Sequence, residues 1–354
     1  MILTEGLSKE REAIFDVLEN CPLDCLAEKN APSPEIQRRV LKREFNQLFY
    51  KLKKEGAQKF PYESLPMDFR WNLCATRLRM GHFDNWDGWQ FRGNFATTFY
   101  LKSFKTPKWM GQPIQTEHGL KVCGEQGVGD EILFMSAFPD LMVRTGPKAL
   151  EIYCHPRLVP IFERSFRVKA SNRPPGLSDI DGESMLLMGE LLKWYRCDGR
   201  FPKKPYLKPD PLKVAYWQEW LAQFPGKHIG FAYKARHGNF KRDEIWGLIS
   251  GQGALFDLQY DEPSHDSPPF DVKEDLENLF AFVKALDKVV TVTQTLAHVA
   301  GSVGTECHAI IPERGTGEVN NRLWYYSHGD TYWPHVVYPN VTVYKNIDEF
   351  RNRI

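Results

Sequence analysis

The chain has 354 residues, of which 42% are hydrophobic, which is enough for the cores of two domains of ordinary size. Its 46 basic residues nearly balance its 45 acidic residues, so the formal net charge of +1 excludes a global basic field for nucleic acid, although not a local patch. A mean hydropathy of -0.46 and the lack of an apolar run long enough to cross a bilayer argue against a membrane protein.

The cysteines and the first residues favour a reducing compartment. The seven cysteines are scattered without CxxC spacing, and no Cys or His pairs complete a zinc site. The start at Met1 lacks the basic and apolar segments of a signal peptide. We therefore expect a cytoplasmic protein with reduced thiols and no metal, and its oligomeric state stays open.

Residues 1–98 are predicted to form a helical extension. Apolar residues recur at helical spacing between Pro34 and Glu55, with charges on the other face. Residues 68–94 are predicted to form a helix pair in which Gly81 ends the first helix and Trp86 and Trp89 pack against it. This pattern is typical of one degenerate tetratricopeptide-like repeat, a packing or interaction module, and no second copy follows.

A predicted strand at 119–123 runs into a glycine-rich loop at the start of an apolar helix. Gly124, Gly127 and Gly129 allow a ligand to approach the backbone closely, and Asp130 would face the same crevice. The loop is neither the GxGxxG dinucleotide motif nor a P-loop. The alternative is that Asp130 only compensates the helix dipole.

Strands and helices then alternate in two series. The first series is a predicted strand at 149–153, a helix at 155–164, a short strand at 168–170 and a helix or strand–helix element at 185–194. It ends at a linker rich in Pro and Lys at 200–211. The second has a helix at 216–224, strands at 228–233, 255–259 and 289–292, and a helix at 276–285. A basic loop at 234–242 follows one of its strands. This alternation predicts an α/β protein with two Rossmann-like domains whose parallel sheets face each other across a cleft.

The last predicted strand ends in a polar turn followed by a helix of small residues. Thr293, Gln294 and Thr295 can cap that helix, whose N-terminus favours phosphate. The small side chains of residues 297 and 300–302 would let another backbone or a flat ligand come close. The alternative for His298 is a hydrogen-bonded packing histidine.

Four motifs together resemble a known family. They are Gly81-His82-Phe83-Asp84 with the tryptophans after it, Gly124 to Ile132, Pro205-Tyr206-Leu207-Lys208-Pro209-Asp210, and Val292 to Gly304. In this order, over roughly residues 70–345, the chain resembles the tetratricopeptide-repeat glycosyltransferases related to bacterial heptosyltransferases and, more distantly, to protein O-GlcNAc transferase.

The resemblance implies a GT-B fold and an inverting transfer that needs no metal or cofactor, with a nucleotide-sugar as co-substrate. It implies that Asp130 is the base and that Gly127, Val128 and Gly129 form the loop on the acceptor side. The donor diphosphate would lie at Thr293, Gln294, Thr295, Leu296 and Ala297, with His298 behind. The diphosphate charge would be stabilised by Lys234, Arg236, Lys241 and Arg242, for which the alternative is a solvated loop.

The same resemblance divides the chain into a helical extension at 1–98, an acceptor-side domain at 99–211, a nucleotide-sugar domain at 212–340, and a C-terminal helix within 341–354 that crosses back to the first domain. Departures from the family pattern fall at 232–235, at Thr293-Gln294 and at 321–325, all around the donor site. These departures leave the base and the sugar of the donor open.

Several functions stay open. The acceptor could be a glycan, a protein or a modified DNA base, and the near-zero net charge counts against DNA. The alternative from another class is a catalytically silent GT-B-fold binding or scaffold protein. An oxidoreductase is the third choice, because no GxGxxG follows any predicted strand.

Overall fold

The structure is a computed structural model of the chain. It describes residues 105–124, 127–174, 180–196, 200–201, 203–235, 238–311, 327–328, 331–332, 337–344 and 346–354. The predicted helical extension at 1–98, with its tetratricopeptide-like helix pair, lies outside the described residues. So do Arg236 and the segment 321–325.

The first domain is built on a four-stranded parallel sheet of order β3-β2-β1-β4. Its strands are β1 (Leu120–Cys123), β2 (Leu150–Cys154), β3 (Ala170–Asn172) and β4 (Ser184–Leu187). Leu120 pairs with both Leu150 and Ser184, so β1 is central and its carboxyl end opens into the glycine-rich loop. Strands β1, β2 and β3 fall within one or two residues of their predicted positions, and β4 lies at the start of the segment 185–194 that was predicted as a helix or a strand–helix element.

Helices lie in the connections from β1 to β2 and from β2 to β3, as parallel pairing requires. They are α5 (Val128–Phe134), α6 (Phe138–Thr145) and α7 (Val159–Phe166), with short 3-10 turns η6 (Met135–Ala137), η7 (Pro147–Ala149) and η8 (Pro156–Leu158). Helix α8 (Glu190–Tyr195) follows β4. The predicted helix at 155–164 begins four residues late. The reason is local, because a 3-10 turn at Pro156 comes first.

The segment between the domains differs from its prediction. Helix α9 (Pro211–Leu221) begins at the end of the predicted linker rather than at residue 216. Asp210 is its N-cap and accepts hydrogen bonds from the backbone N–H groups of Leu212 and Lys213. An Asp followed by Pro at the first helical position is a helix-start signal, which explains the earlier beginning.

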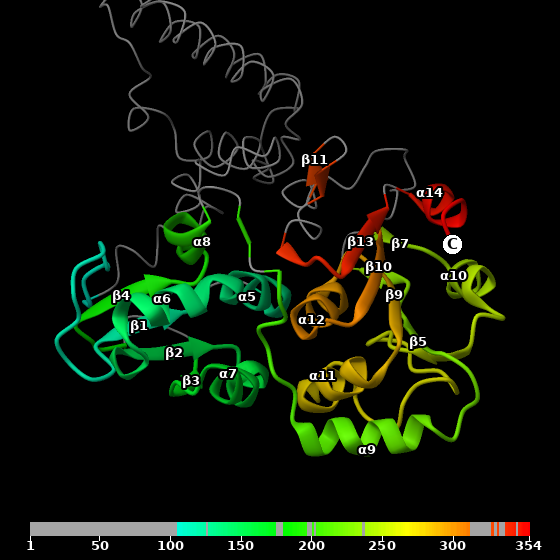
Figure 1. Cartoon of the computed structure of the whole chain (residues 1–354), viewed down its shortest axis with the longest axis horizontal. Coiled ribbons are helices and arrows are strands. Elements are labelled where there is room, and N and C mark those ends of the chain that lie inside the picture. The colour runs from blue at the N-terminus through cyan, green and yellow to red at the C-terminus, as the bar shows by residue number, and fades with distance from the viewer. Residues whose placement is uncertain are drawn as a thin grey trace, which may run out of the picture.

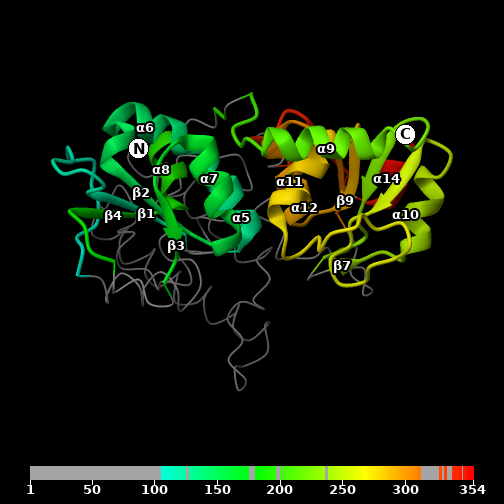
Figure 2. The same ribbon diagram turned by 90° about the horizontal axis from the view of Figure 1, so that it is seen from below.

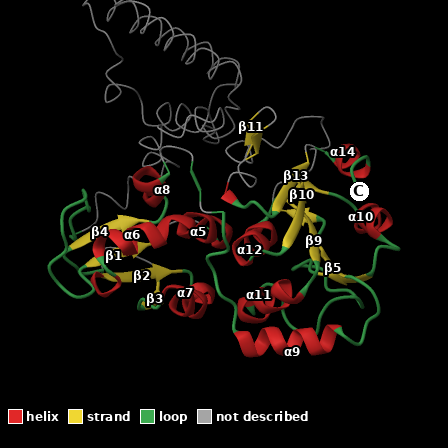
Figure 3. Ribbon diagram, viewed as in Figure 1, coloured by secondary structure: helices red, strands yellow, loops and turns green. Residues whose placement is uncertain are grey.

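The second domain holds a five-stranded parallel sheet of order β13-β10-β9-β5-β8. Its strands are β5 (His228–Phe231), β8 (Ala254–Asp257), β9 (Lys288–Val292), β10 (Glu306–Ile310) and β13 (Val341–Tyr344). Two antiparallel hairpins lie outside it: β6 (Lys234–Ala235) with β7 (Gly238–Asn239), and β11 (Ser327–His328) with β12 (Thr331–Tyr332). The two sheets with their helices form two neighbouring α/β units (Figure 3).

Helices α10 (Arg242–Ile249), α11 (Leu276–Ala285), α12 (Thr295–Val303) and α14 (Ile347–Arg351) belong to this second domain. The bounds of α11 agree with the prediction. The C-terminal helix does not cross back to the first domain as expected. Phe350 of α14 is fully buried in one cluster with Tyr344 and Ile310, so α14 packs on β13 at the far side of the second sheet (Figure 1).

The two domains are in direct contact. Helix α5 of the first domain lies beside α12 of the second, as both views show (Figures 1 and 2). On α7 the guanidinium of Arg164 binds both carboxylate oxygens of Glu277 on α11, at 2.6 and 3.0 Å. Arg157 donates to the backbone carbonyl of Lys273. The starts of two predicted site helices therefore meet at the domain boundary.

Candidate functional site

Helix α5 begins at the glycine-rich loop. Gly127 is its N-cap, and the carboxylate of Asp130 accepts a hydrogen bond from the Gly127 backbone N–H at 3.3 Å. Val128 and Gly129 form the first turn. Asp130 therefore accepts a hydrogen bond at the helix start and compensates the helix dipole there. It also lies in the turn that faces the second domain.

Gly129 brings α5 against the start of α12. A β-carbon added at Gly129 would lie 3.0 Å from Cδ2 of His298 and 3.4 Å from Cα of Thr295. A side chain at this position would push the two helices apart. The structure thus brings together the glycine-rich loop and the predicted diphosphate turn, which are more than 160 residues apart in the chain.

His298 is buried, with 7% of its surface exposed. Its Nδ1 lies 3.1 Å from the hydroxyl of Tyr338. Burial lowers the pKa of His298 to about 4, although the nearby Asp130 charge acts in the opposite direction. His298 is therefore neutral near pH 7, so it has no positive charge to offer a diphosphate.

The turn between β9 and α12 is less capped than its sequence predicts. Gln294 occupies the N-cap position but makes no side-chain cap, and its amide instead donates to the hydroxyl of Thr291 at 3.2 Å. The Oγ1 of Thr293 is buried without a hydrogen-bond partner. Leu296 and Ala297 are buried. The positive end of the α12 dipole is thus left without a capping side chain among the described residues.

The predicted basic loop is a hairpin followed by the start of a helix. Lys234 begins β6, Lys241 is the N-cap of α10 and Arg242 is the first residue of α10. The Lys234 ammonium forms an ion pair with Glu262. Arg242 lies 3.1 Å from Asp257, pairs with Asp266 and lies over the Trp246 ring. Lys234 and Arg242 are therefore not solvated cations.

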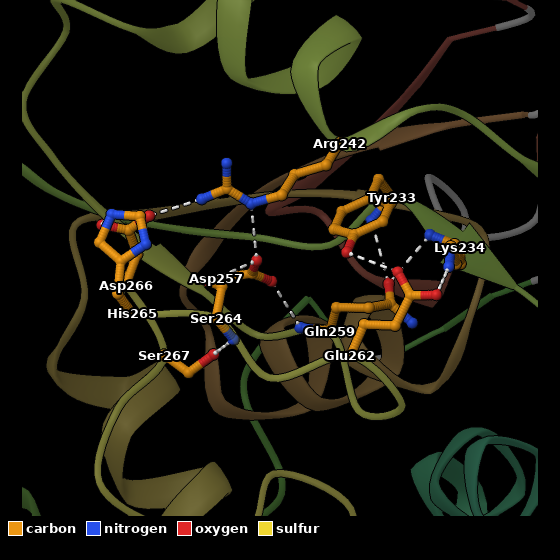
Figure 4. A network of polar contacts seen from close by, with 10 residues as sticks. All are labelled: Tyr233, Lys234, Arg242, Asp257, Gln259, Glu262, Ser264, His265, Asp266 and Ser267. Atoms are coloured by element: carbon orange, nitrogen blue, oxygen red, sulfur yellow. Dashed lines mark hydrogen bonds and ion pairs between the residues drawn. The ribbon is translucent and has the colours of Figure 1, made fainter.

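These pairs belong to a polar network that the sequence analysis missed (Figure 4). Asp257 is fully buried at the end of β8 and accepts hydrogen bonds from Ser264 Oγ and the Gln259 backbone N–H, both at 3.0 Å. The side-chain carbonyl of Gln259 accepts from the backbone N–H groups of Tyr233 and Lys234. The network orders the loop at the carboxyl end of β5 and β8. An Asp at a strand end was the available signal, but its partners are not visible in a sequence.

The buried carboxylate of Glu131, next to Asp130, is a second feature that the sequence analysis did not identify. It is fully buried, its carboxylate lies 3.0 Å from Arg173, and it accepts from the His155 backbone N–H at 2.8 Å. A β-carbon at Gly124 would lie 2.3 Å from that carboxylate. Gly124 therefore makes room for Glu131, whereas it was predicted to allow a ligand to approach the backbone.

No group of three or more His, Cys, Asp or Glu side chains among the described residues is arranged to hold a metal ion. None of the helices in the described ranges is both long and apolar enough to cross a bilayer.

Comparison with known proteins identifies one curated relative. The chain is 26% identical over 264 residues to protein FlbA of Caulobacter vibrioides, covering 63% of this chain and 44% of FlbA. The chain thus spans less than half the length of this relative. No family model matches the chain.

The structural neighbours are bacterial glycosyltransferases at low similarity. A glycosyl transferase family 9 protein of Veillonella parvula has a TM-score of 0.45 at 10% identity, covering 68% of this chain and 92% of that one. The ADP-heptose lipopolysaccharide heptosyltransferase II of E. coli has a TM-score of 0.42 at 13% identity, with coverages of 64% and 90%. The iron-containing glycosyltransferase TibC of E. coli has a TM-score of 0.42 at 8% identity, with coverages of 56% and 59%.

Proposed function

We propose that this protein is a GT-B glycosyltransferase that moves a sugar from a nucleotide-sugar donor to an acceptor hydroxyl. One observation carries the proposal: Gly129, next to Asp130, packs against Thr295 and His298 across the domain boundary. The Asp130 carboxylate, which follows β1 of the first sheet, thus lies near the uncapped N-terminus of α12, which follows β9 of the second sheet. Ligands of open α/β proteins bind at such carboxyl ends.

The proposed chemistry assigns one task to each domain. The Asp130 carboxylate takes the proton of the acceptor hydroxyl while that oxygen forms a bond to the anomeric carbon. The bond between this carbon and the diphosphate breaks, and its electron pair leaves with the diphosphate. The N-terminus of α12, with the turn at Thr293 and Gln294, stabilises the departing charge. Attack from the side opposite the leaving group inverts the anomeric carbon.

In this proposal the basic side chains bind the diphosphate only after they release their carboxylate partners. Lys234 and Arg242 would have to exchange their carboxylate partners for diphosphate oxygens, because Glu262, Asp257 and Asp266 occupy them in the free protein. Lys241 contributes its backbone N–H to Glu244. We propose a minor contribution from these side chains to donor binding. Calorimetric titration of a diphosphate into the Arg242→Gln variant tests this, and a tenfold weaker affinity would contradict it.

A thermal-shift screen against nucleoside diphosphates and nucleotide sugars at about 1 mM tests the proposed function. A ligand present at about a hundred times its dissociation constant adds about 2.7 kcal/mol of stability, which raises the melting temperature by a few degrees. A shift with nucleotides of one base, and none with the nucleoside alone, would support the proposal and name the donor class. No shift with any compound would contradict it.

The acceptor is proposed as a glycan or a protein in preference to DNA. The formal net charge of +1 and the ion pairing of Lys234 and Arg242 leave little positive potential for a phosphate backbone. DNA binding measured at low salt tests this choice. Tight binding that falls steeply with added salt would favour the DNA acceptor instead.

The same ion pairs favour a second candidate, a catalytically silent GT-B-fold binding or scaffold protein. Such a protein would keep the domain contact while Arg242 holds loop carboxylates rather than a diphosphate. An Asp130→Ala variant separates the candidates. Full biological activity of that variant would favour the scaffold, and loss of activity with normal thermal stability would favour the enzyme.

A further inference from the structure

The loop after β8, residues 257–267, is closed at its base. The backbone N–H of Asp257 donates to the carbonyl of Asp266 at 3.0 Å, so the two ends of the loop lie side by side. The Arg242 guanidinium binds the carboxylates of both residues. The Asp257 side chain is fully buried, and that of Asp266 is 18% exposed. Breaking these contacts would leave a buried charge without its partner, so the base of the loop is held firmly.

The tip of the same loop is fastened differently. Residues 260–263 are exposed, and Glu262 reaches back to the turn after β5 (Figure 4). Its carboxylate accepts a hydrogen bond from the Tyr233 hydroxyl at 3.3 Å and forms an ion pair with the Lys234 ammonium. The Glu262 side chain is 55% exposed. An ion pair this open to water contributes little to stability, so another anion can replace the carboxylate at low cost.

The backbone of the turn does not depend on Glu262. The side-chain carbonyl of Gln259 accepts hydrogen bonds from the backbone N–H groups of Tyr233 and Lys234, at 3.2 and 2.9 Å. Gln259 is buried, with 1% of its surface exposed. It therefore keeps the turn in place if the tip moves, and the two side-chain donors of the turn remain where they are.

These donors lie beside the turn that precedes α12. In the second sheet β5 and β9 are parallel neighbours, and Phe231 pairs with Val290. Lys234 follows Phe231 by three residues, as Thr293 follows Val290, so both turns leave the same edge of the sheet. Neighbouring strands are about 4.8 Å apart. A phosphate bound at the start of α12 would thus have the turn of Lys234 on the adjacent strand.

Both side-chain donors suit a phosphate as well as a carboxylate. The Tyr233 hydroxyl keeps its hydrogen, because burial and the nearby charges of Asp257 and Glu262 raise its pKa to about 12. The hydrogen bond with Glu262 raises the pKa of Lys234, so its ammonium is charged. Phosphate oxygens accept hydrogen bonds from such donors, and bonds between charged groups are the stronger ones. The Glu262 carboxylate therefore occupies positions that suit phosphate oxygens.

We propose that the Tyr233 hydroxyl and the Lys234 ammonium form a phosphate site for the donor, and that Glu262 is an intramolecular competitor that occupies this site in the free protein. A bound phosphate displaces Glu262 and the tip at 260–263 moves away, while the base at Arg242 stays in place. The identity of the ligand rests on the proposed function. The competition also explains why the net contribution of Lys234 to donor binding is small, since the ligand has to replace an existing partner.

Calorimetric titration of the wild type and Glu262→Gln tests the competition. The ligands are inorganic pyrophosphate and a nucleoside diphosphate that stabilises the wild type. The variant keeps the size of the side chain and removes its charge, so the Lys234 ammonium is expected to bind the ligand instead. The affinity for both ligands should rise about threefold to fivefold, which is what the loss of an exposed ion pair allows. An unchanged or lower affinity would overturn the proposal.

Asp261→Asn is the matched control on the same tip. Asp261 is exposed and carries the same charge, but its carboxylate accepts a hydrogen bond from the Gln259 side-chain amide at 2.7 Å. It acts on Lys234 only through its charge, and an asparagine can still accept from Gln259. The affinity should therefore rise by less than about twofold. An equal rise in both variants would mean that the loop acts through its overall charge, and would refute the role of Glu262.

A double variant identifies the group that Glu262 occupies. In Lys234→Gln/Glu262→Gln the ligand meets neither the ammonium nor its competitor, so the gain in affinity should disappear. Melting curves of each variant show that it is folded. If the double variant keeps the gain, Lys234 is not the phosphate partner and the proposal is wrong.

The two proposals fail in different ways. If Glu262→Gln binds pyrophosphate more tightly but no nucleotide or nucleotide sugar stabilises the protein, sugar transfer fails and the competition at Lys234 stands. If nucleotides bind the wild type and Glu262→Gln leaves their affinity unchanged, the competition fails and sugar transfer stands. If neither pyrophosphate nor any nucleotide binds the wild type or Glu262→Gln, both proposals fail.

Discussion

At the scale of residues, burial distinguishes two neighbouring carboxylates on α5. Asp130 is partly exposed and bonds to the Gly127 backbone N–H, whereas Glu131 is fully buried against Arg173 and the His155 N–H. Both stand in the first turn of the helix, so either could have been the candidate base. Only the direction in which each side chain points makes Glu131 an anchor of α5 and Asp130 a group that a substrate can reach.

We expect Asp130→Asn to lower the rate of sugar transfer by about 10²–10⁴, because the amide cannot accept the proton. The melting temperature should change little. Glu131→Gln is the neighbouring control and should cost about 1–3 kcal/mol of stability, because it disrupts a buried charged contact. Steady-state rates and thermal denaturation of both variants check this, and unchanged transfer by Asp130→Asn would exclude it as the base.

The pH dependence of stability provides a second test at this scale. The pKa of His298 is about 4 in the folded protein, because burial disfavours its charge, and about 6.5 in the unfolded chain. Between these values the unfolded state binds more protons, so this contribution is fully present above about pH 6.5 and is lost as the pH falls toward 4. The loss is up to about 3 kcal/mol.

Urea denaturation of the wild type and His298→Gln from pH 7 to pH 4 measures this contribution. The variant should lose less stability on acidification than the wild type. The control is His265→Gln, because the His265 side chain is 86% exposed. Equal pH slopes for the wild type and His298→Gln would contradict the assignment.

At the scale of elements, small residues serve helix packing. Residues 297 and 300–302 of α12 were predicted to let another backbone or a flat ligand come close. In the structure Gly301 faces the Tyr338 ring, and Gly129 of α5 faces Thr295 and His298. The small residues therefore allow protein side chains and helices to approach α12. This explains why their spacing alone could not identify a ligand site.

We expect Gly129→Ala to destabilise the protein by about 1–3 kcal/mol, because the added methyl group would force α5 and α12 apart. Gly127→Ala is the matched control two residues earlier, where a β-carbon would lie 3.5 Å from an oxygen of Asp130, which is an ordinary van der Waals distance. It should cost less than about 1 kcal/mol. Chemical denaturation compares the two, and equal losses would argue against a tight helix contact.

At the scale of the whole molecule, side chains from both domains hold the two sheets together. Arg164 binds Glu277 through two hydrogen bonds, and both side chains are partly buried, at 24% and 21% exposed. The motif at 205–210 is docked against α12 and bonds to α5. The domain arrangement is therefore stabilised at several points around the candidate site.

A double-mutant cycle with Arg164→Met and Glu277→Gln should yield a coupling energy of about 1 kcal/mol, because the pair is bidentate and partly desolvated. The control cycle uses Arg351 and Asp348, a pair on α14 with side chains 57% and 72% exposed. Its coupling should stay below about 0.5 kcal/mol. Urea midpoints provide both coupling energies. Equal values would mean that the interdomain pair stabilises the protein no more than an exposed pair does.

The sequence alone determined the α/β class, the two series of strands and the positions of most elements in the described part of the chain. The glycine-rich loop at the end of β1 and the turn before α12 were also found, because strand runs and turn residues are local signals. The start of α9 is also a local signal, Asp210 followed by Pro211, which the prediction overlooked. The sequence could not place the pairing of Arg242 with Asp257 and Asp266, or the position of α14.

Tertiary structure decided those features because they depend on side chains that are distant in the sequence. Tyr206 and Tyr338 are 132 residues apart, yet their hydroxyls lie 3.3 Å from each other between α5 and α12. No periodicity or spacing encodes such a contact. It follows from how two sheets with their helices pack against each other, and this packing is also what brings Asp130 to the start of α12.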